Sequence, residues 1–171
     1  MSHKYITLKE KKSIESWASK LKKEKILSYS RKKALVKLNL PYKCIGSGKH
    51  RIVFDIGNGH VLKVARVKKG IKCNKNEVVL YKRVTSSLRK HLSKIVDHGY
   101  GWVVMKKITK KMPRGSNDYK KKAYKVYRKF KDHGMKINDI IYKNSRSPNR
   151  ANVRISKHGR VVLIDYANSS K

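Results

Sequence analysis

The turn signal Asn58-Gly59, set between two apolar runs, constrains the fold of this chain more than any other feature. Both residue types tolerate the positive φ angles that a tight hairpin needs, so residues 51–56 and 60–64 are predicted to pair as antiparallel strands. Three other apolar runs have the length of strands, namely residues 42–45, 95–98 and 102–108. The sequence therefore predicts five short strands in this part of the chain.

Helical patterns precede the strands. Residues 7–23 begin with Thr7 and Glu10, the spacing of a capping box, in which a hydroxyl and a carboxylate each accept a hydrogen bond from a backbone amide. One apolar stripe at helical spacing is made by Ile14, Trp17, Ala18 and Leu21. A second, shorter helix is predicted over residues 28–38. The two helices form a basic N-terminal extension, residues 1–40, for which Trp17 is the expected anchor.

Two further helices and a hairpin are predicted downstream. Residues 75–89 carry apolar side chains at helical spacing, namely Val78, Val79, Tyr81, Val84 and Leu88. Residues 118–131 do the same with Ala123, Val126, Tyr127 and Phe130. Gly134 supplies a C-terminal stop for that helix. The last predicted elements are strands 153–155 and 161–164, so the fold class is α+β.

The charge balance is extreme. Lys and Arg number 46 against 10 Asp and Glu, a formal net charge of +36. Such a field attracts polyanions, which are nucleic acid, an anionic membrane surface or an acidic protein. The basic loop that follows Tyr142, from Lys143 to Arg154, is a candidate contact for nucleic acid, with the tyrosine available for stacking. Because the lysines are spread along the chain, a general bias of composition is the alternative explanation.

Cysteine usage and hydropathy point to the interior of a cell. Cys44 and Cys73 do not form a metal-binding C-x-x-C pair and are read as free thiols in a reducing compartment. No apolar run approaches the length of a membrane span, and the N-terminus carries no signal-like apolar segment. An intracellular location is therefore expected, in a cytoplasm or the interior of a host cell.

Gly46 and Gly48 lie between the first two predicted strands, where glycines let a hairpin backbone approach phosphate groups closely. A Walker-type phosphate loop is excluded, because residue 50 is His50 where that motif needs Ser or Thr. The pattern G-x-G-x-x-G-x-V is matched by Gly46, Gly48 and Val53, with Arg51 in place of the third glycine. Taken alone, two glycines in a hairpin more often mark only a turn.

Lys63 lies inside the apolar strand 60–64. An unpaired buried ammonium is costly, so this side chain needs a partner. The order of a glycine hairpin, a strand lysine and a helix resembles the arrangement in protein kinases, which implies phosphate oxygens and a glutamate of the following helix as partners. Glu77 lies near the start of that predicted helix. The alternative is a lysine that reaches solvent from an edge strand.

The segment from Asn152 to Ala167 resembles the stretch of protein kinases that runs from a metal-binding asparagine to the Asp-Phe-Gly motif. Asn152 and Asp165 lie thirteen residues apart, the family's usual separation, and a hairpin would present an amide oxygen and a carboxylate to magnesium. Tyr166 and Ala167 replace the family's Phe and Gly. The alternative for Asp165 is a solvated aspartate at a strand end.

The helix over 118–131 leads into a segment that resembles the start of a kinase catalytic loop. Asp139 would be the catalytic aspartate, accepting the proton of the acceptor hydroxyl. Asn144, five residues later, keeps the family's spacing and is the alternative to Asn152 as the metal ligand. Only ten acids are present, and Glu77, Asp139 and Asp165 are three of them, so their placement by chance is improbable.

Residues 42–167 therefore resemble the protein-kinase-like superfamily in a minimal or truncated form. The resemblance implies a five-stranded antiparallel small lobe, residues 41–108, and a reduced helical large lobe, residues 109–171. ATP would bind between the lobes. The groups implied around it are Lys63 and Glu77 at the phosphates, Gly46 and Gly48 over them, Val53 and Ala65 against the adenine, and Asn152 and Asp165 on magnesium.

Three functions remain open at this point. The first is an ATP-dependent phosphotransferase similar to a Ser/Thr kinase, with an acidic protein or other polyanion as acceptor. The second is a catalytically weak pseudokinase, favoured by the altered motifs and by the absence after Ala167 of the segments that hold a peptide in that family. The third is a nucleic-acid or polyanion binder that uses the same fold. The sequence does not predict an oligomeric state.

Overall fold

The computed structural model describes residues 5–23, 29–137, 140–142, 147–167 and 169–170. Within this part, the chain divides into two compact units. Unit 1 comprises residues 1–78 and 95–106, and unit 2 comprises residues 79–94 and 107–171.

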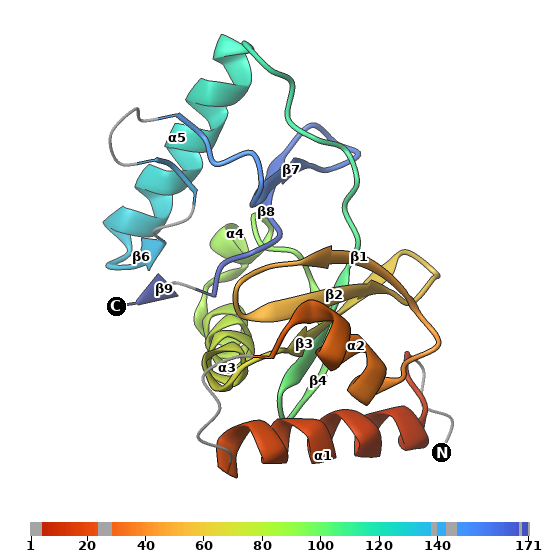
Figure 1. Ribbon diagram of the computed structural model, residues 1–171. Coiled ribbons are helices and arrows are strands. Elements are labelled where there is room, and N and C mark those ends of the chain that lie inside the picture. The colour runs from red at the N-terminus through yellow and green to blue at the C-terminus, as the bar shows by residue number, and fades with distance from the viewer. Residues whose placement is uncertain (1–4, 24–28, 138–139, 143–146, 168, 171) are drawn as a thin grey trace. The chain divides into compact units, whose positions relative to one another are not determined.

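Unit 1 contains the predicted five-stranded antiparallel sheet (Figure 1), with the strand order β1-β2-β3-β5-β4. The strands are β1 Lys43–Ser47, β2 Arg51–Asp55, β3 His60–Ala65, β4 Ile95–Gly99 and β5 Trp102–Lys106. The hairpin between β2 and β3 turns at the predicted place, with φ of 48° at Asn58 and 71° at Gly59. The prediction of this sheet from its turn signals and apolar runs is confirmed.

The helices are α1 Leu8–Lys23, α2 Arg31–Leu38, α3 Lys68–Arg83, α4 Ser86–Arg89 and α5 Asn117–Asp132. The capping box of α1 forms as predicted: the Thr7 amide donates to Glu10 Oε2 at 2.6 Å, and the Glu10 amide donates to Thr7 Oγ1 at 3.2 Å. Gly134, with φ of 71°, follows the end of α5 as expected.

The helix predicted over residues 75–89 is wrong in its bounds and in part of its buried face. The structure has two helices instead, because α3 ends at Arg83 and Thr85, in extended conformation, begins α4. Val79 is 49% exposed, whereas Leu80 is buried. α3 also begins earlier than predicted and contains Gly70, whose missing side chain lets the helix lie against the His50 carbonyl; a Cβ there would collide with that oxygen.

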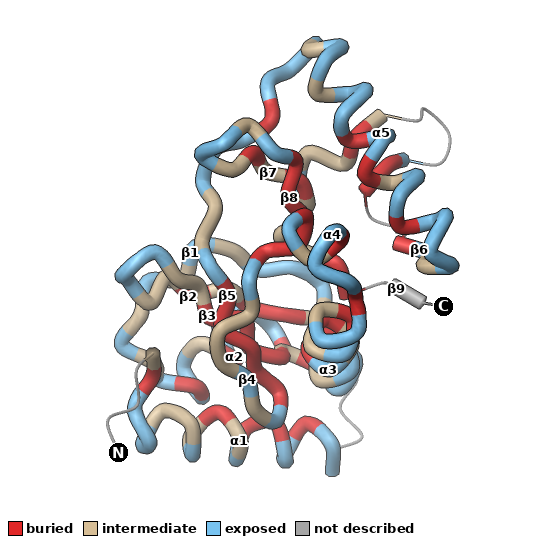
Figure 2. The backbone as a smooth tube through the Cα atoms, turned by 180° about the vertical axis from the view of Figure 1, so that it is seen from behind, coloured by how far each residue is buried: buried red, intermediate tan, exposed pale blue. Residues whose placement is uncertain are grey.

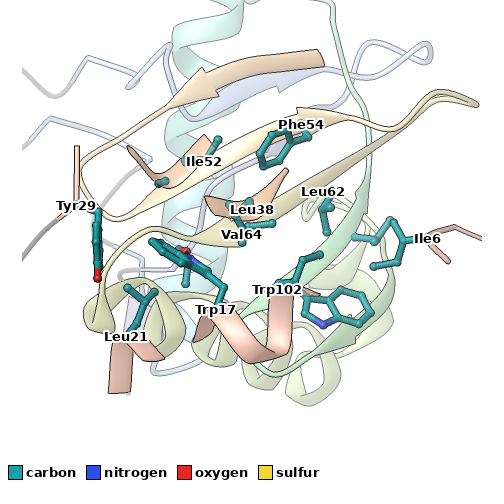
Figure 3. Close-up of a cluster of buried hydrophobic side chains, with 14 residues drawn as sticks. Ile6, Trp17, Leu21, Tyr29, Leu38, Ile52, Phe54, Leu62, Val64 and Trp102 are labelled. Atoms are coloured by element: carbon teal, nitrogen blue, oxygen red, sulfur yellow. Dashed lines mark hydrogen bonds between the residues drawn. The ribbon is translucent and has the colours of Figure 1, made fainter. Parts of the chain in front are cut away.

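One apolar core fills the space between the sheet of unit 1 and the helices α1 and α2 (Figure 3). Residues directly opposite each other in an antiparallel sheet point to the same face. The pairs Ile52–Val64 and Phe54–Leu62 therefore place four apolar side chains on the face that meets Trp17. The N-terminal helices thus complete the core of the unit that carries the sheet.

Trp17 anchors α1 to the sheet, as expected. Its indole Nε1 donates a buried hydrogen bond of 2.8 Å to the carbonyl of Ala65, at the end of β3. Its ring packs on Tyr29, with ring centroids 4.9 Å apart. Trp17 therefore combines apolar burial with a fixed polar contact to the strand that carries Lys63.

Unit 2 contains α5 and the predicted C-terminal hairpin, formed by β7 Val153–Ile155 and β8 Val161–Leu163. A pair of two-residue strands, β6 Lys136–Ile137 and β9 Ser169–Ser170, was not predicted. The segment before β4 also pairs with β8: the Leu163 amide donates to the His91 carbonyl, and the Ser93 amide donates to the Leu163 carbonyl. Figure 2 shows β8 buried along its length.

Candidate functional site

Lys63 lies at the middle of an interior strand. β3 has β2 on one side and β5 on the other, and Lys63 is opposite Val53 on β2 and Val103 on β5. Only 5% of Lys63 is exposed. The alternative of a lysine that reaches solvent from an edge strand is therefore wrong, and the ammonium group requires partners inside the protein.

Glu77 of α3 is a partner of Lys63. Lys63 Nζ lies 2.9 Å from Glu77 Oε1, and the carboxylate is completely buried. Gly70 brings the first turn of α3 against the end of the β2–β3 pair, and Glu77 follows two turns later on the same helix. The pairing suggested by the order of these residues in the sequence is thus present in the structure.

Arg51 is a second buried cation on the same carboxylate, and sequence reasoning did not assign it this contact. Arg51 Nη1 lies 2.7 Å from Glu77 Oε2, so the two cations hold opposite oxygens of one carboxylate. The signal that was available is its position: Arg51 stands two residues before Val53, and therefore points to the same face of the sheet as Val53 and Lys63.

Asn74 completes this polar cluster. Its Oδ1 accepts a hydrogen bond from Arg51 Nη1 at 3.1 Å, and its Nδ2 donates to the Gly101 carbonyl at 2.8 Å. The side chain is 2% exposed. Asn74 therefore fixes the guanidinium group of Arg51 between α3 and the β4–β5 turn. Lys63, Arg51, Glu77 and Asn74 are called the Glu77 cluster below.

Gly46 and Gly48 lie in the β1–β2 hairpin, which closes with a hydrogen bond of 2.9 Å from the Gly48 amide to the Arg51 carbonyl. Neither glycine has a positive φ angle. A Cβ at Gly48 would have no neighbour within 4 Å, and one at Gly46 would make ordinary contact with Val53 at 3.7 Å. Neither the backbone conformation nor the packing of unit 1 therefore requires glycine at these two positions.

The two residues expected against an adenine differ in accessibility. Val53 is half-buried and directly opposite Lys63. Ala65 is completely buried: its amide donates to Gly101, its carbonyl accepts from Trp17, and it lies next to Gly70. Val61, which sequence reasoning did not select, lies on the face of Lys63, is half-buried and is opposite Met105.

In unit 2, Asn152 and Asp165 come together at one end of the C-terminal hairpin. Val153 is opposite Leu163, and the ladder continues with a hydrogen bond of 2.9 Å from the Ile164 amide to the Asn152 carbonyl. Asp165 follows directly, and both polar residues are half-buried. An amide oxygen and a carboxylate are a donor set that suits magnesium.

Tyr166, which stands where the resembled motif has Phe, is held in the interior of unit 2. It is completely buried, and its hydroxyl donates to the Ser93 carbonyl at 3.0 Å. Asp139, the expected catalytic aspartate, and Asn144, the alternative metal ligand, lie outside the described residues. Their assignments stay predictions.

The described residues hold no group of three or more His, Cys, Asp or Glu side chains arranged around a common metal position. Within the same part of the chain, no helix has the length and apolar character needed to cross a bilayer. Cys44 and Cys73 are free thiols, as predicted.

Comparison with known proteins relates this chain to others through its fold. No family model matches the sequence, and no curated protein matches it. Among solved structures, this chain is similar to two structures of the protein WbdD. One of these structures describes WbdD as a bifunctional kinase-methyltransferase. Each aligns with 15% sequence identity and a TM-score of 0.54, over 71% and 77% of this chain.

The chain spans about a third of the length of these two structures, since the alignments cover 30% and 33% of them. At this identity the likeness concerns the fold alone. Together with the antiparallel sheet and the α3 helix that follows its third strand, it supports a kinase-like fold of the α+β class for this chain.

Proposed function

We propose that this protein is an ATP-dependent phosphotransferase of the protein-kinase-like kind. The observation that carries the proposal is the buried pair of Lys63 on the central strand and Glu77 on α3, with 2.9 Å between Nζ and Oε1. A buried ion pair contributes little to stability by itself, because desolvation of both charges offsets their attraction. A buried pair of this kind on a kinase-like fold is better explained by a functional role in binding or catalysis than by its contribution to stability.

The task proposed for Lys63 is to hold phosphate oxygens of ATP. Lys63, Arg51 and Glu77 together carry one excess positive charge. Because Arg51 and Asn74 hold the carboxylate side of the cluster, the ammonium group is positioned before any nucleotide arrives. Donors that are already in place stabilise developing charge without reorganisation, which is the main means of catalysis in phosphoryl transfer.

The two hairpin glycines support the same proposal. In unit 1, neither a positive φ angle nor a close neighbour explains glycine at Gly46 or Gly48, and Gly46 adjoins an irregularity in the β1–β2 register, so a contact with a ligand is a candidate reason for Gly48 above all. Close approach of a backbone to a phosphate group is such a reason. Val53 and Ala65 were expected to contact the adenine. The half-buried Val53 is accessible for this contact, whereas Ala65 is fully buried. Val61, which is half-buried, is an additional candidate.

Asn152 and Asp165 would hold magnesium, which supplies charge neutralisation at the transferred phosphate when it is bound. Their position at one end of the hairpin fits this role. Asp139 is proposed to orient the acceptor hydroxyl and to take its proton. The acceptor class that suits so basic a protein is an acidic protein or another polyanion.

Transfer of labelled γ-phosphate from Mg-ATP tests the proposal, with an acidic and a basic generic protein as acceptors beside autophosphorylation. The wild-type protein is expected to transfer label. Asp165→Asn removes one negative charge and keeps the shape of the side chain, and this variant is expected to abolish transfer. Saturable Mg-ATP binding without transfer would identify a pseudokinase instead. Absence of both transfer and binding would overturn the assignment of a nucleotide site.

A second function, binding of nucleic acid, is favoured by the solvent face of α5. Its apolar side chains Ala123, Val126 and Phe130 are buried, and its exposed basic residues are Lys120, Lys121, Lys122, Lys125, Arg128, Lys129 and Lys131. Lys121, Tyr124, Lys125 and Arg128 share one stripe at helical spacing, and Tyr124 is 37% exposed. Cations around an accessible aromatic ring suit a phosphate backbone with stacked bases.

A further inference from the structure

Unit 1 holds a second group of cations, distinct from the Glu77 cluster. Lys49 and His50 lie in the hairpin before β2, Arg66 follows β3, and Lys69 lies in the first turn of α3. We call these four residues the β2–α3 cation cluster.

Hydrogen bonds hold this cluster together. The Arg66 amide donates to the His50 carbonyl at 2.8 Å, and Arg66 Nη2 donates to the Lys49 carbonyl at 2.9 Å. Gly70 lets α3 pack directly against the His50 carbonyl, which brings the neighbouring Lys69 to the same place. Three separate segments thus bring cationic side chains together through fixed backbone contacts.

The cluster has no balancing negative charge among the residues that act on its histidine. Burial lowers the pKa of His50, and the charged groups that lower it further are all cations, namely Lys69, Lys49, Arg51 and Arg66. Of these, Arg51 is paired with Glu77. The positive charges therefore act on one another without a carboxylate that raises the pKa of the imidazole.

Two nitrogens of the cluster also lack a hydrogen-bond partner among the described residues. They are His50 Nδ1 and Arg66 Nε, and both are covered by protein. A buried polar nitrogen without a partner costs free energy. The like charges describe a place where an oxyanion would relieve electrostatic repulsion, and the two covered nitrogens add a cost that the described residues do not offset.

We propose that the β2–α3 cation cluster is a binding site for a phosphate dianion. Arg66 offers a planar set of N–H donors, and the exposed Lys49 and Lys69 offer ammonium groups beside it. Several converging cations favour a dianion over a single carboxylate. The site goes beyond the proposed phosphotransferase activity, because none of its four residues belongs to the nucleotide assignment; Lys49 directly follows Gly48 of that assignment, so the test includes competition by Mg-ATP.

The test follows the histidine imidazoles by nuclear magnetic resonance while inorganic phosphate replaces chloride at constant ionic strength. The His50 signals are expected to shift saturably, and the pKa of His50 is expected to rise when phosphate binds. The exposed His158 serves as the internal control and is expected to stay unchanged. A peptide with phosphoserine forms a second arm: tighter binding than inorganic phosphate identifies a phosphorylated side chain as the source, and equal binding identifies the free ion.

Two variants of α3 separate a built site from the general field of a highly basic protein. Lys69→Ala removes a cluster cation, whereas Lys72→Ala removes an exposed lysine of the same helix that does not act on His50. Lys69→Ala is expected to weaken phosphate binding by about two- to fivefold, and Lys72→Ala to leave it unchanged. Arg66→Ala is expected to weaken it by about tenfold or more, the factor for one charge-assisted hydrogen bond.

An unmoved His50, or equal weakening by Lys69→Ala and Lys72→Ala, would overturn the proposal and leave an adventitious ion only. Both lysines are exposed, so neither variant depends on the fold tolerating a core change. Displacement of phosphate from His50 by Mg-ATP would also overturn it, because the cluster would then belong to the nucleotide site. A protein that transfers no phosphate from ATP but shows the His50 shift would disprove the proposed function and keep this site.

Discussion

Arg51 Nη1 lies 2.7 Å from Glu77 Oε2, on the opposite side of the carboxylate from Lys63. One fully buried acid thus balances two nearly buried cations on neighbouring strands. Such an arrangement is sensitive to loss of the shared acid and more tolerant of the loss of one cation, because the remaining cation still pairs with Glu77.

Glu77→Gln is therefore expected to destabilise the protein strongly. It leaves Arg51 and Lys63 buried without this counter-charge, and breaking a buried pair in this way costs about 3–5 kcal/mol. Urea denaturation measures the change. The control is Asp118→Asn, which removes an exposed acid paired with Lys122 on α5 and should cause no measurable loss. Equal stability of Glu77→Gln and the wild type would contradict the structural role given to the cluster.

Trp17→Phe tests the attachment of α1 to the sheet. The variant keeps an aromatic ring beside Tyr29 but leaves the Ala65 carbonyl without the indole donor. The expected cost is about 1–3 kcal/mol, measured as a fall in the free energy of unfolding. Tyr100→Phe, which changes an exposed ring of the same unit, is the matched control. A Trp17→Phe protein as stable as that control would mean that α1 is held by other contacts.

Stability should fall in acid partly because of His91. Its Nδ1 lies 2.9 Å from the Val161 carbonyl, and its buried Nε2 has no partner among the described residues. Burial lowers the pKa of His91 below its ordinary value of 6.5; the Val161 carbonyl opposes this shift, and nearby cations add to it. As the pH falls, His91 takes up a proton in the unfolded chain before it does so in the folded protein. The contribution of His91 to the free energy of unfolding is therefore complete above pH 6.5 and is lost as the pH drops through the lower folded pKa.

The free energy of unfolding, measured from about pH 5 to about pH 7, should therefore rise with pH. His91→Gln should reduce this slope without removing it, because His50 contributes in the same direction. His158→Gln, which changes an exposed histidine, is the matched control. An unchanged slope in His91→Gln would show that other groups account for the acid sensitivity.

The α5 stripe predicts a salt-dependent affinity for nucleic acid. Replacing Lys121, Lys125 and Arg128 by Gln should weaken binding of a labelled single-stranded oligonucleotide. It should also reduce the slope of log affinity against log salt concentration by up to about 2. Each phosphate that the protein no longer neutralises accounts for about 0.7 of this slope. Replacing the exposed Lys9, Lys12 and Lys20 of α1 by Gln removes the same charge from another helix. Equal weakening in the two triple variants would indicate a diffuse attraction and no α5 surface.

The sheet was predictable because its signals are local. Asn58-Gly59 between apolar runs is a strong local signal for a hairpin, and the capping box of α1 needs only Thr7 and Glu10. The extent of α3 was not predictable in this way. Gly70 reads as a helix breaker, and only the closeness of the His50 carbonyl explains why a glycine belongs inside this helix.

For the candidate site, the cost of burying an unpaired ammonium group predicted only that Lys63 needs a partner, and the resemblance to kinases pointed to Glu77 as that partner. The contact of Arg51 with Glu77 did not follow, because it depends on which face of β2 meets α3, a relationship set by packing. Asn152 and Asp165 lie at the same end of a hairpin whose two strands were both predicted from local patterns, whereas their role as metal ligands was expected from the resemblance to kinases and stays a prediction.

We propose that the Lys63–Glu77 pair prepares a site for the phosphates of ATP. This is tested by the rates of phosphate transfer from Mg-ATP in two lysine variants. Lys63→Met removes the buried ammonium while Arg51 still pairs with Glu77, and Lys82→Met removes an exposed lysine near the end of α3. We expect Lys63→Met to remain folded and to transfer phosphate about a hundredfold or more slowly, with Lys82→Met unchanged. A folded Lys63→Met protein that transfers phosphate at the wild-type rate would contradict the claim.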